Sequence, residues 1–136
     1  MKYDDIENAY FFVSMAPQYT HSVLLCRETG ETYYISELGD ADELPEDVDD
    51  PDKYRAIPHK NDLDLGKRLV MDFITEFCSE DLRKAHDIFR RKGAYSRYKE
   101  LLETRGLLDK WYDFEKRRTE EALRQWCGEN GVDLTD

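Results

Sequence analysis

Residues 21–36 read HSVLLCRETGETYYIS, and this stretch decides the first half of the fold. Two strand-like runs, 22–26 and 32–36, flank the short sequence ETG. Gly30 has no Cβ atom and therefore tolerates the positive φ that closes a tight turn. The pattern predicts an antiparallel β-hairpin.

The rest of the chain predicts one more strand and several helices. The sequence YRAIP, residues 54–58, predicts a short strand that ends at Pro58. The helical spacing of apolar residues predicts a helix over residues 3–13 and a run of helices after residue 61. The expected fold class is therefore α+β, a small antiparallel hairpin-based sheet followed by a bundle of about four helices. The length fits a single domain, residues 1–136.

Polar residues mark where these helices begin. Asn61, Asp62 and Asp64 are expected to cap free N–H groups at the start of the first helix after the sheet. Ser79 is the expected N-cap of the next helix, and Gly93 is its expected end.

Glycines also mark the ends of the last two helices. A helix over 94–104 is expected to end at Gly106. The last helix is expected over 108–127, ending near Gly128.

The chain is strongly acidic, with a formal net charge of −11 and 38% charged residues. Nine acids and no base lie in residues 37–52, which predicts an acidic loop inside the domain. The N-terminal sequence MKYDDIENAYFF has acids where a signal peptide has bases. No segment approaches the roughly 20 apolar residues of a membrane helix. We therefore expect a cytoplasmic protein with no membrane partner.

Residues 83–105 carry eight bases against three acids. On one continuous helix, four of these bases would fall within about 120° of each other, forming a basic stripe: Arg83, Lys84, Arg90 and Arg91. Arg97 and Lys99 flank the apolar side of the next helix. Tyr95 and Tyr98 lie beside leucines on that helix and are expected in the core.

Several partners fit such a stripe. The acidic loop of the same chain would neutralise it, and so would an acidic surface on another protein. Nucleic acid is a further alternative, because clustered bases release counterions from phosphates. The net charge of −11 argues against nucleic acid, since it repels polyanions. A small anion at a helix N-terminus is the remaining alternative.

The last helix holds charged residues on its apolar side. Glu115 and Arg118 are three residues apart, so they are able to meet. They are expected to form a buried polar pair, either as a structural ion pair or at the floor of a groove.

The chain has no recognisable catalytic motif. The loop IPHKND, residues 57–62, is the best candidate for chemistry, because His59 and Lys60 are able to hold an anion or a proton there. Three widely spaced cysteines, Cys26, Cys78 and Cys127, predict buried thiols and neither a disulfide framework nor a zinc site. We therefore expect no enzyme, no cofactor and no metal site.

Four segments occur in a fixed order: TGETYYIS, IPHKNDLDLGKRLVMDFI, FRRKGAYSRYKELL and GLLDKWYDFE. Together they resemble an uncharacterised bacterial protein family over roughly residues 20–128. The matching positions are Gly30, Ile57, Pro58, Phe73, Ile74, Gly93, Ala94, Tyr95, Arg97, Tyr98, Lys99, Trp111 and Phe114. At 95 and 98 the family pattern favours phenylalanine, so the hydroxyls here need partners. The resemblance implies a common fold and no assigned activity.

The expected function is a non-enzymatic protein-interaction or regulatory domain. Its contact surfaces would be the basic stripe and the acidic loop. The first alternative is a nucleic-acid-associated regulator that uses the bases of residues 83–99. The second is a small-ligand or hydrolytic protein centred on His59 and Lys60.

Overall fold

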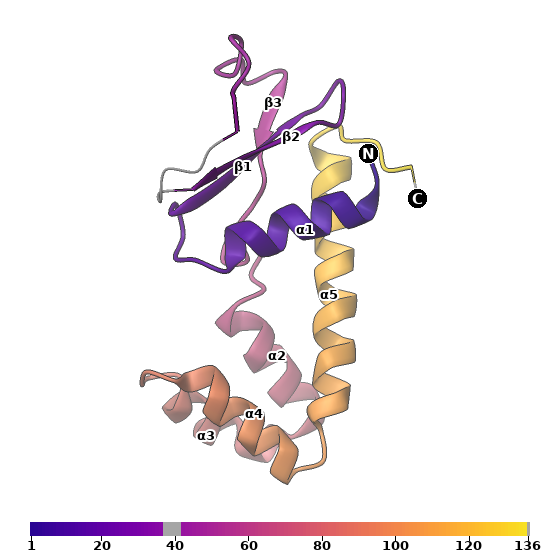
Figure 1. Ribbon diagram of the computed structural model, residues 1–136. Helices are drawn as coiled ribbons and strands as arrows, with labels where there is room; N and C mark the ends of the chain where they lie inside the picture. The colour runs from indigo at the N-terminus through magenta and orange to yellow at the C-terminus, as the bar shows by residue number, and fades with distance from the viewer. Residues whose placement is uncertain (37–41, 136) are drawn as a thin grey trace. The chain divides into compact units, whose positions relative to one another are not determined.

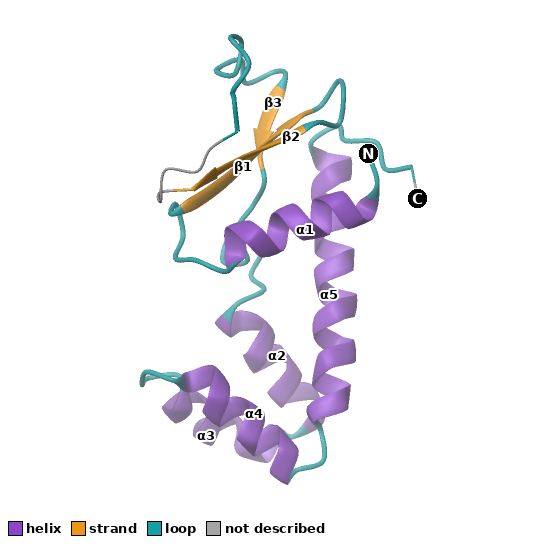
Figure 2. Cartoon of the chain, in the orientation of Figure 1, coloured by secondary structure: helices purple, strands orange, loops and turns teal. Residues whose placement is uncertain are grey.

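The computed structural model describes residues 1–36 and 42–135, and over these residues the chain is α+β (Figures 1 and 2). The elements in chain order are α1 (Tyr3–Ser14), β1 (His21–Cys26), β2 (Thr32–Ser36), β3 (Tyr54–Ala56), α2 (Lys67–Phe77), the 3₁₀ turn η1 (Ser79–Asp81), α3 (Leu82–Ile88), α4 (Ala94–Thr104) and α5 (Leu108–Glu129). The predicted fold class is confirmed. None of the described helices is long and apolar enough to span a bilayer.

The chain divides into two compact units. Unit 1 contains residues 1–63 and 120–136, and unit 2 contains residues 64–119. Both units contain part of α5, which continues through residue 119. The sequence predicts a single domain, in which the two units would unfold together. This stays a prediction.

Unit 1 is built on a three-stranded antiparallel sheet with the strand order β2-β1-β3. Val23 of β1 lies opposite Tyr34 of β2, and Leu25 of β1 lies opposite Arg55 of β3. Gly30 closes the hairpin with a φ of +78°, and its N–H donates to the Cys26 carbonyl at 2.8 Å. The predicted hairpin and the predicted third strand are therefore both confirmed.

The first helix packs against β1 through the apolar side that the sequence predicts. Val23 and Leu25 of β1 are fully buried. The residues that α1 buries are Tyr3, Ile6, Ala9, Tyr10 and Val13. In the same unit, the guanidinium of Arg124 lies over the Tyr3 ring, 4.6 Å from its centroid.

Unit 2 is held together by an aromatic cluster. The Phe73 ring of α2 makes edge-on contacts with Trp111 and Phe114 of α5, at centroid distances of 5.4 and 5.2 Å. Trp111 in turn contacts Tyr98 of α4 edge-on at 5.0 Å. Such edge-to-face pairs contribute beyond their area burial, so three helices share one core.

The start of α2 differs from the prediction. The helix begins at Lys67, with Gly66 at its N-cap and no side-chain cap. Asp62 instead accepts the His59 N–H at 3.0 Å. Asp64 has a φ of +55°, in the left-handed region, and this interrupts a helix that would start at Asn61.

The ends of α3 also differ. Ser79 begins η1 and makes no capping hydrogen bond, and α3 starts only at Leu82. Gly93 does not end α3, which stops at Ile88. With a φ of +73° it precedes α4 as its N-cap residue.

The last two helices end in similar turns. Gly106 has a φ of +68°, and the Leu107 N–H donates to the Leu102 carbonyl at 2.8 Å, as in a Schellman motif. The predicted helix over 94–104 is confirmed. α5 continues past Gly128, however, and the residue with positive φ after it is Gly131.

Candidate functional site

The basic segment, residues 83–99, is the most unusual part of unit 2. It contains seven lysines and arginines against one acid, Asp87. All seven side chains are exposed: Arg83, Lys84, Arg90, Arg91, Lys92, Arg97 and Lys99.

The basic segment is not a stripe along one helix, so this prediction was wrong. Arg83 and Lys84 lie on α3, but the helix ends at Ile88. Arg90 and Arg91 therefore lie in the turn between α3 and α4. Their N–H groups donate at 3.3 Å to carbonyls three residues earlier in the chain, which is turn geometry.

The tyrosines of the basic segment have different environments. The Tyr98 ring is fully buried, as predicted, and contacts Phe89 at 5.7 Å. Burial raises the pKa of Tyr98, so its hydroxyl stays neutral. That hydroxyl has no hydrogen-bond partner among the described residues. Tyr95 packs edge-on against Phe89 but is 39% exposed, so only part of it belongs to the core.

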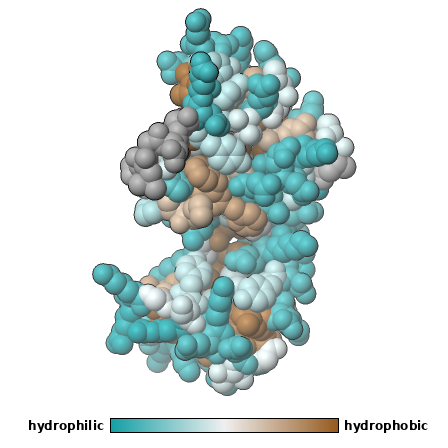
Figure 3. Space-filling view, viewed as in Figure 1, coloured by the Kyte–Doolittle hydropathy of each residue, from teal (hydrophilic) through white to brown (hydrophobic). Residues whose placement is uncertain are grey.

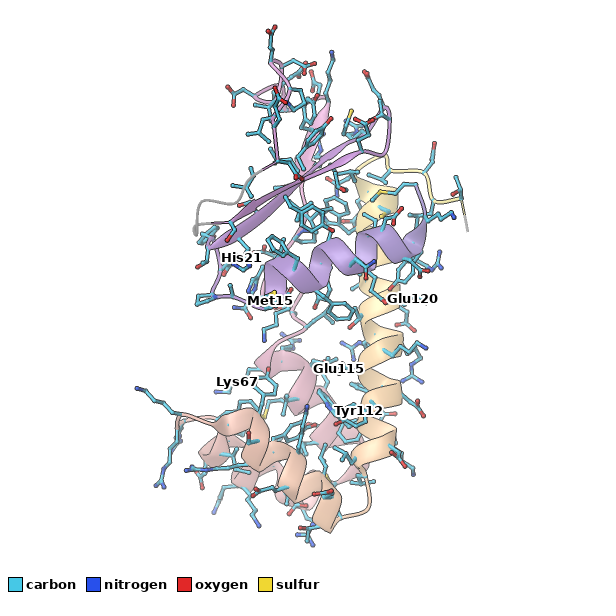
Figure 4. All side chains as sticks on the ribbon, viewed as in Figure 1. Met15, His21, Lys67, Tyr112, Glu115 and Glu120 are labelled. Atoms are coloured by element: carbon cyan, nitrogen blue, oxygen red, sulfur yellow. The ribbon has the colours of Figure 1, made fainter. Side chains whose placement is uncertain are left out.

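Most of these bases form no ion pair within the described part of the chain. Arg90 pairs with Asp87 at 3.5 Å, and both side chains are exposed. Lys99 lies over the ring of Tyr112, 5.5 Å from its centroid; Tyr112 is labelled in Figure 4. Among the described residues, no carboxylate forms an ion pair with the other five: Arg83, Lys84, Arg91, Lys92 and Arg97.

A groove of about 470 Å³ opens between α3 and α4, which lie side by side in Figure 1. Lys84 and Ile88 line it from α3, one helical turn apart. Its lining from α4 is Arg97, Glu100, Leu101 and Thr104, which recur at the spacing of one helix face.

Arg105 closes one end of the groove and is held in place. Its Nε and Nη2 atoms donate to the two carboxylate oxygens of Asp81, each at 2.9 Å. These bonds lower the pKa of Asp81, which is buried. Arg105 is therefore already paired. Among the described residues, Lys84 and Arg97 form no ion pair, although the Lys84 charge also helps to lower the pKa of Asp81.

Charge is distributed unequally between the two units. Unit 2 contains 14 lysines and arginines against 11 acids, a net charge of +3, whereas unit 1 contains 6 against 20, a net charge of −14. Figure 3 shows that much of the visible surface is hydrophilic. The net charge of unit 2 is therefore positive, although the net charge of the whole chain is negative.

The predicted buried pair of Glu115 and Arg118 is wrong. Glu115, labelled in Figure 4, is exposed, and Arg118 is only half-buried. Arg118 donates to Asp72 of α2 at 3.1 Å and lies over the Phe114 ring. Both charged side chains therefore remain in contact with solvent.

His59 is buried, and both of its ring nitrogens are used by the chain. Nε2 donates to the Ala16 carbonyl and Nδ1 accepts the Asn61 N–H, each at 3.0 Å. The Lys60 N–H donates to the Ser14 hydroxyl at 3.0 Å. These hydrogen bonds attach the loop to the end of α1 and to the segment that follows it. Neither ring nitrogen of His59 is therefore available to a ligand.

A small cavity of about 120 Å³ lies beside this loop, between α1 and the sheet of unit 1. His21 lines it, and its Nδ1 lies 3.2 Å from the Phe12 carbonyl. Met15, the C-cap residue of α1, is labelled in Figure 4 and is 74% exposed.

The described part of the acidic loop is attached to its own unit. Asp42 accepts the Tyr34 N–H and donates its own N–H to the Tyr34 carbonyl, so it covers the outer edge of β2. Asp47 accepts from Lys53 and from Tyr54, and the first of these bonds lowers its pKa. Residues 37–41 lie outside the described part of the chain.

The structure places the three cysteines in the interior. All three are free thiols and buried. Among residues 1–36 and 42–135, no group of histidines, cysteines and acids is placed to hold a metal ion.

Sequence reasoning missed part of the groove. Glu100, Leu101 and Thr104 recur with Arg97 at helical spacing, a signal that was available. The pairing of Arg105 with Asp81 joins residues 24 positions apart and has no such signal. The contact of α3 with α4 that makes the groove is likewise tertiary.

Together, the fold and these residues define a small α+β protein with an exposed basic segment and a groove within it. A match to the uncharacterised protein family UPF0158 covers residues 23–135. The chain belongs to this family. Neither the curated proteins nor the solved structures contain a match to the chain.

Proposed function

We propose that the chain is a non-enzymatic protein-interaction domain of the cytoplasm, and that its basic segment binds an acidic surface of a partner protein. The observation behind this proposal is the set of five exposed bases without a carboxylate partner among the described residues. The three buried, free thiols suit a reducing compartment.

Charge complementarity accounts for the specificity of such a contact. When a partner's carboxylates approach, these bases have no internal ion pair to break first. Opposite charges also raise the association rate and suppress wrong partners. Unit 1, with its net charge of −14, repels other acidic molecules that have no complementary surface.

Nucleic acid remains the second candidate, supported by seven bases within residues 83–99. The formal net charge of −11 disfavours it, because the chain as a whole repels a uniform polyanion. The candidate function centred on His59 and Lys60 has little support, since both ring nitrogens of His59 are occupied.

The test is capture of partners by the full chain from the lysate of its native cell, with and without nuclease. One variant reverses charges in the basic segment: Arg83→Glu, Arg90→Glu and Arg91→Glu. A matched variant reverses three exposed bases elsewhere in unit 2: Lys67→Glu, Lys110→Glu and Lys116→Glu. Captured proteins are then purified and titrated against all three chains by calorimetry.

We expect one protein to bind near stoichiometrically, to resist nuclease, and to lose at least about tenfold in affinity with the basic-segment variant only. Equal losses with both variants would mean that net charge alone drives binding, and would contradict the proposal. Capture that disappears with nuclease would favour the nucleic-acid candidate instead. Capture of no protein in either arm also contradicts the proposal.

A further inference from the structure

We infer that the groove between α3 and α4 receives an acidic amphipathic helix of the partner protein. Lys84 and Arg97 would bind carboxylates of that helix, and its apolar side would contact Ile88 and Leu101. This inference rests on the proposed function and names the segment that the partner presents.

The dimensions of the groove fit a short helical contact. Its α4 wall extends from Arg97 to Thr104, which is about 10 Å along the helix at roughly 1.5 Å per residue. The volume of about 470 Å³ lies within the usual range of binding pockets. Helices dock in such grooves through side chains at positions i, i+3, i+4 and i+7.

The chemistry of the groove combines an apolar floor with positive walls. Ile88 is half-buried and offers an aliphatic surface to an occupant, whereas Leu101 is 6% exposed and forms the closed base of the groove. Lys84 and Arg97 form no ion pair with a carboxylate among the described residues, although the charge of Lys84 also acts on Asp81. An occupant with aliphatic and carboxylate side chains would complement both the apolar floor and the basic walls of the groove.

Glu100 restricts which acidic molecules fit. It is exposed and lines the same groove as Lys84 and Arg97. A uniformly acidic chain or a phosphate backbone would bring negative charge against Glu100, which is unfavourable. A helix avoids this by presenting an uncharged or basic residue at that position.

The test uses the full-length chain and a fluorescein-labelled probe peptide. The probe has leucines at i, i+3, i+4 and i+7, and glutamates on the adjoining positions. A second peptide has the same composition in scrambled order. Anisotropy gives the affinities, and the methyl NMR signals of Ile88 and Leu101 report contact with the floor.

The groove variant is Lys84→Ala with Arg97→Ala, and the matched control is Lys67→Ala with Lys116→Ala, two exposed bases of unit 2 outside the basic segment. All four side chains are exposed, so both variants are expected to fold. We expect the groove variant to weaken probe binding at least about tenfold and the control less than about threefold. The scrambled peptide should bind as weakly as the probe binds the groove variant.

Equal affinities for the two peptides, equal losses in the two variants, unshifted methyl signals or no binding of the probe would each overturn this inference. The proposed function fails separately. If the captured partner is lost with the basic-segment variant but binds the groove variant like the wild type, the proposed function stands and the groove is not the contact.

Discussion

The hydroxyl of Tyr98 lies in the core of unit 2 with no partner among the described residues. A buried polar group without a hydrogen bond costs about 1–3 kcal/mol. Phenylalanine would keep the ring contacts with Phe89 and Trp111 and would remove that cost. The family resemblance favours phenylalanine at position 98. The unpaired hydroxyl is therefore the group through which tyrosine lowers the stability at this position.

We predict that Tyr98→Phe raises the free energy of unfolding by about 1 kcal/mol. Urea denaturation followed by circular dichroism measures this change. The matched control is Tyr112→Phe, whose ring is 44% exposed and should keep its contact with Lys99. The control should leave stability unchanged. A loss of stability in Tyr98→Phe would show that the hydroxyl is satisfied in solution.

Arg105 keeps the buried Asp81 ionised. Its hydrogen bonds lower the pKa of Asp81 below the ordinary value of about 4. A carboxyl with a lowered pKa in the folded state stabilises the fold above its unfolded-state pKa. This contribution is lost as the pH falls through the folded-state pKa.

We predict that Arg105→Gln lowers the free energy of unfolding by about 2 kcal/mol at neutral pH, because Asp81 is left buried and unpaired. The difference from the wild type should shrink below about pH 4. Urea denaturation across a pH series measures it. The double variant Asp81→Asn with Arg105→Gln should not show this pH dependence. A deficit that stays constant down to the lowest pH would contradict the role of Asp81.

At the scale of elements, the end of α5 depends on Gly131 and not on Gly128. Gly131 has a φ of +69°, and the Val132 N–H donates to the Cys127 carbonyl at 2.9 Å, as in a Schellman motif. A Cβ atom at Gly131 would also lie 2.5 Å from Nη2 of Arg27. Gly128 lies inside the helix, and no atom would contact a Cβ there.

These two glycines make a matched pair of substitutions. We predict that Gly131→Ala lowers the free energy of unfolding by about 1–2 kcal/mol, because alanine resists the left-handed conformation. Gly128→Ala should raise it by up to about 1 kcal/mol, because alanine favours a helix interior. Thermal and urea denaturation of both variants test this. The opposite order of the two variants would place the helix end at Gly128.

The sequence predicts the existence and type of these elements better than their ends. The turn of the hairpin and the end of α4 follow from local signals, because a glycine marks each of them. In the structure, Gly30 and Gly106 both have a positive φ. The predicted start of α2 was wrong because the Asp62 carboxylate accepts the His59 N–H within the loop and does not cap a helix. Nothing local indicates that the helix of Arg83 and Lys84 stops at Ile88.

At the scale of the whole molecule, the predictable part of the site is its charge. Counting bases along the chain is enough to find the basic segment. The groove needs the pairing of α3 with α4, and the buried ion pair of Asp81 with Arg105 needs the tertiary fold. The separation of charge between the two units also follows only once their boundaries are known.

From the sequence, the acidic loop is one of the alternative partners of the basic stripe, and a contact between the acidic loop and the basic segment stays a prediction. Removing the loop would also remove Asp42 and Asp47, which hold the sheet of unit 1. A gentler test neutralises three exposed acids of the loop: Glu43→Gln, Glu46→Gln and Asp49→Asn. A matched variant neutralises three exposed acids elsewhere in unit 1: Asp4→Asn, Glu28→Gln and Asp133→Asn.

Heparin retention at rising salt compares the two variants. If the loop covers the basic segment, its variant should elute at clearly higher salt than the control, because the bases become available to heparin. Equal gains would mean that the acids act only through long-range repulsion, since both variants have the same net charge. Unchanged retention of both variants would contradict coverage by the loop and would also contradict long-range repulsion. The basic segment would then be as accessible in the wild type as in the variants.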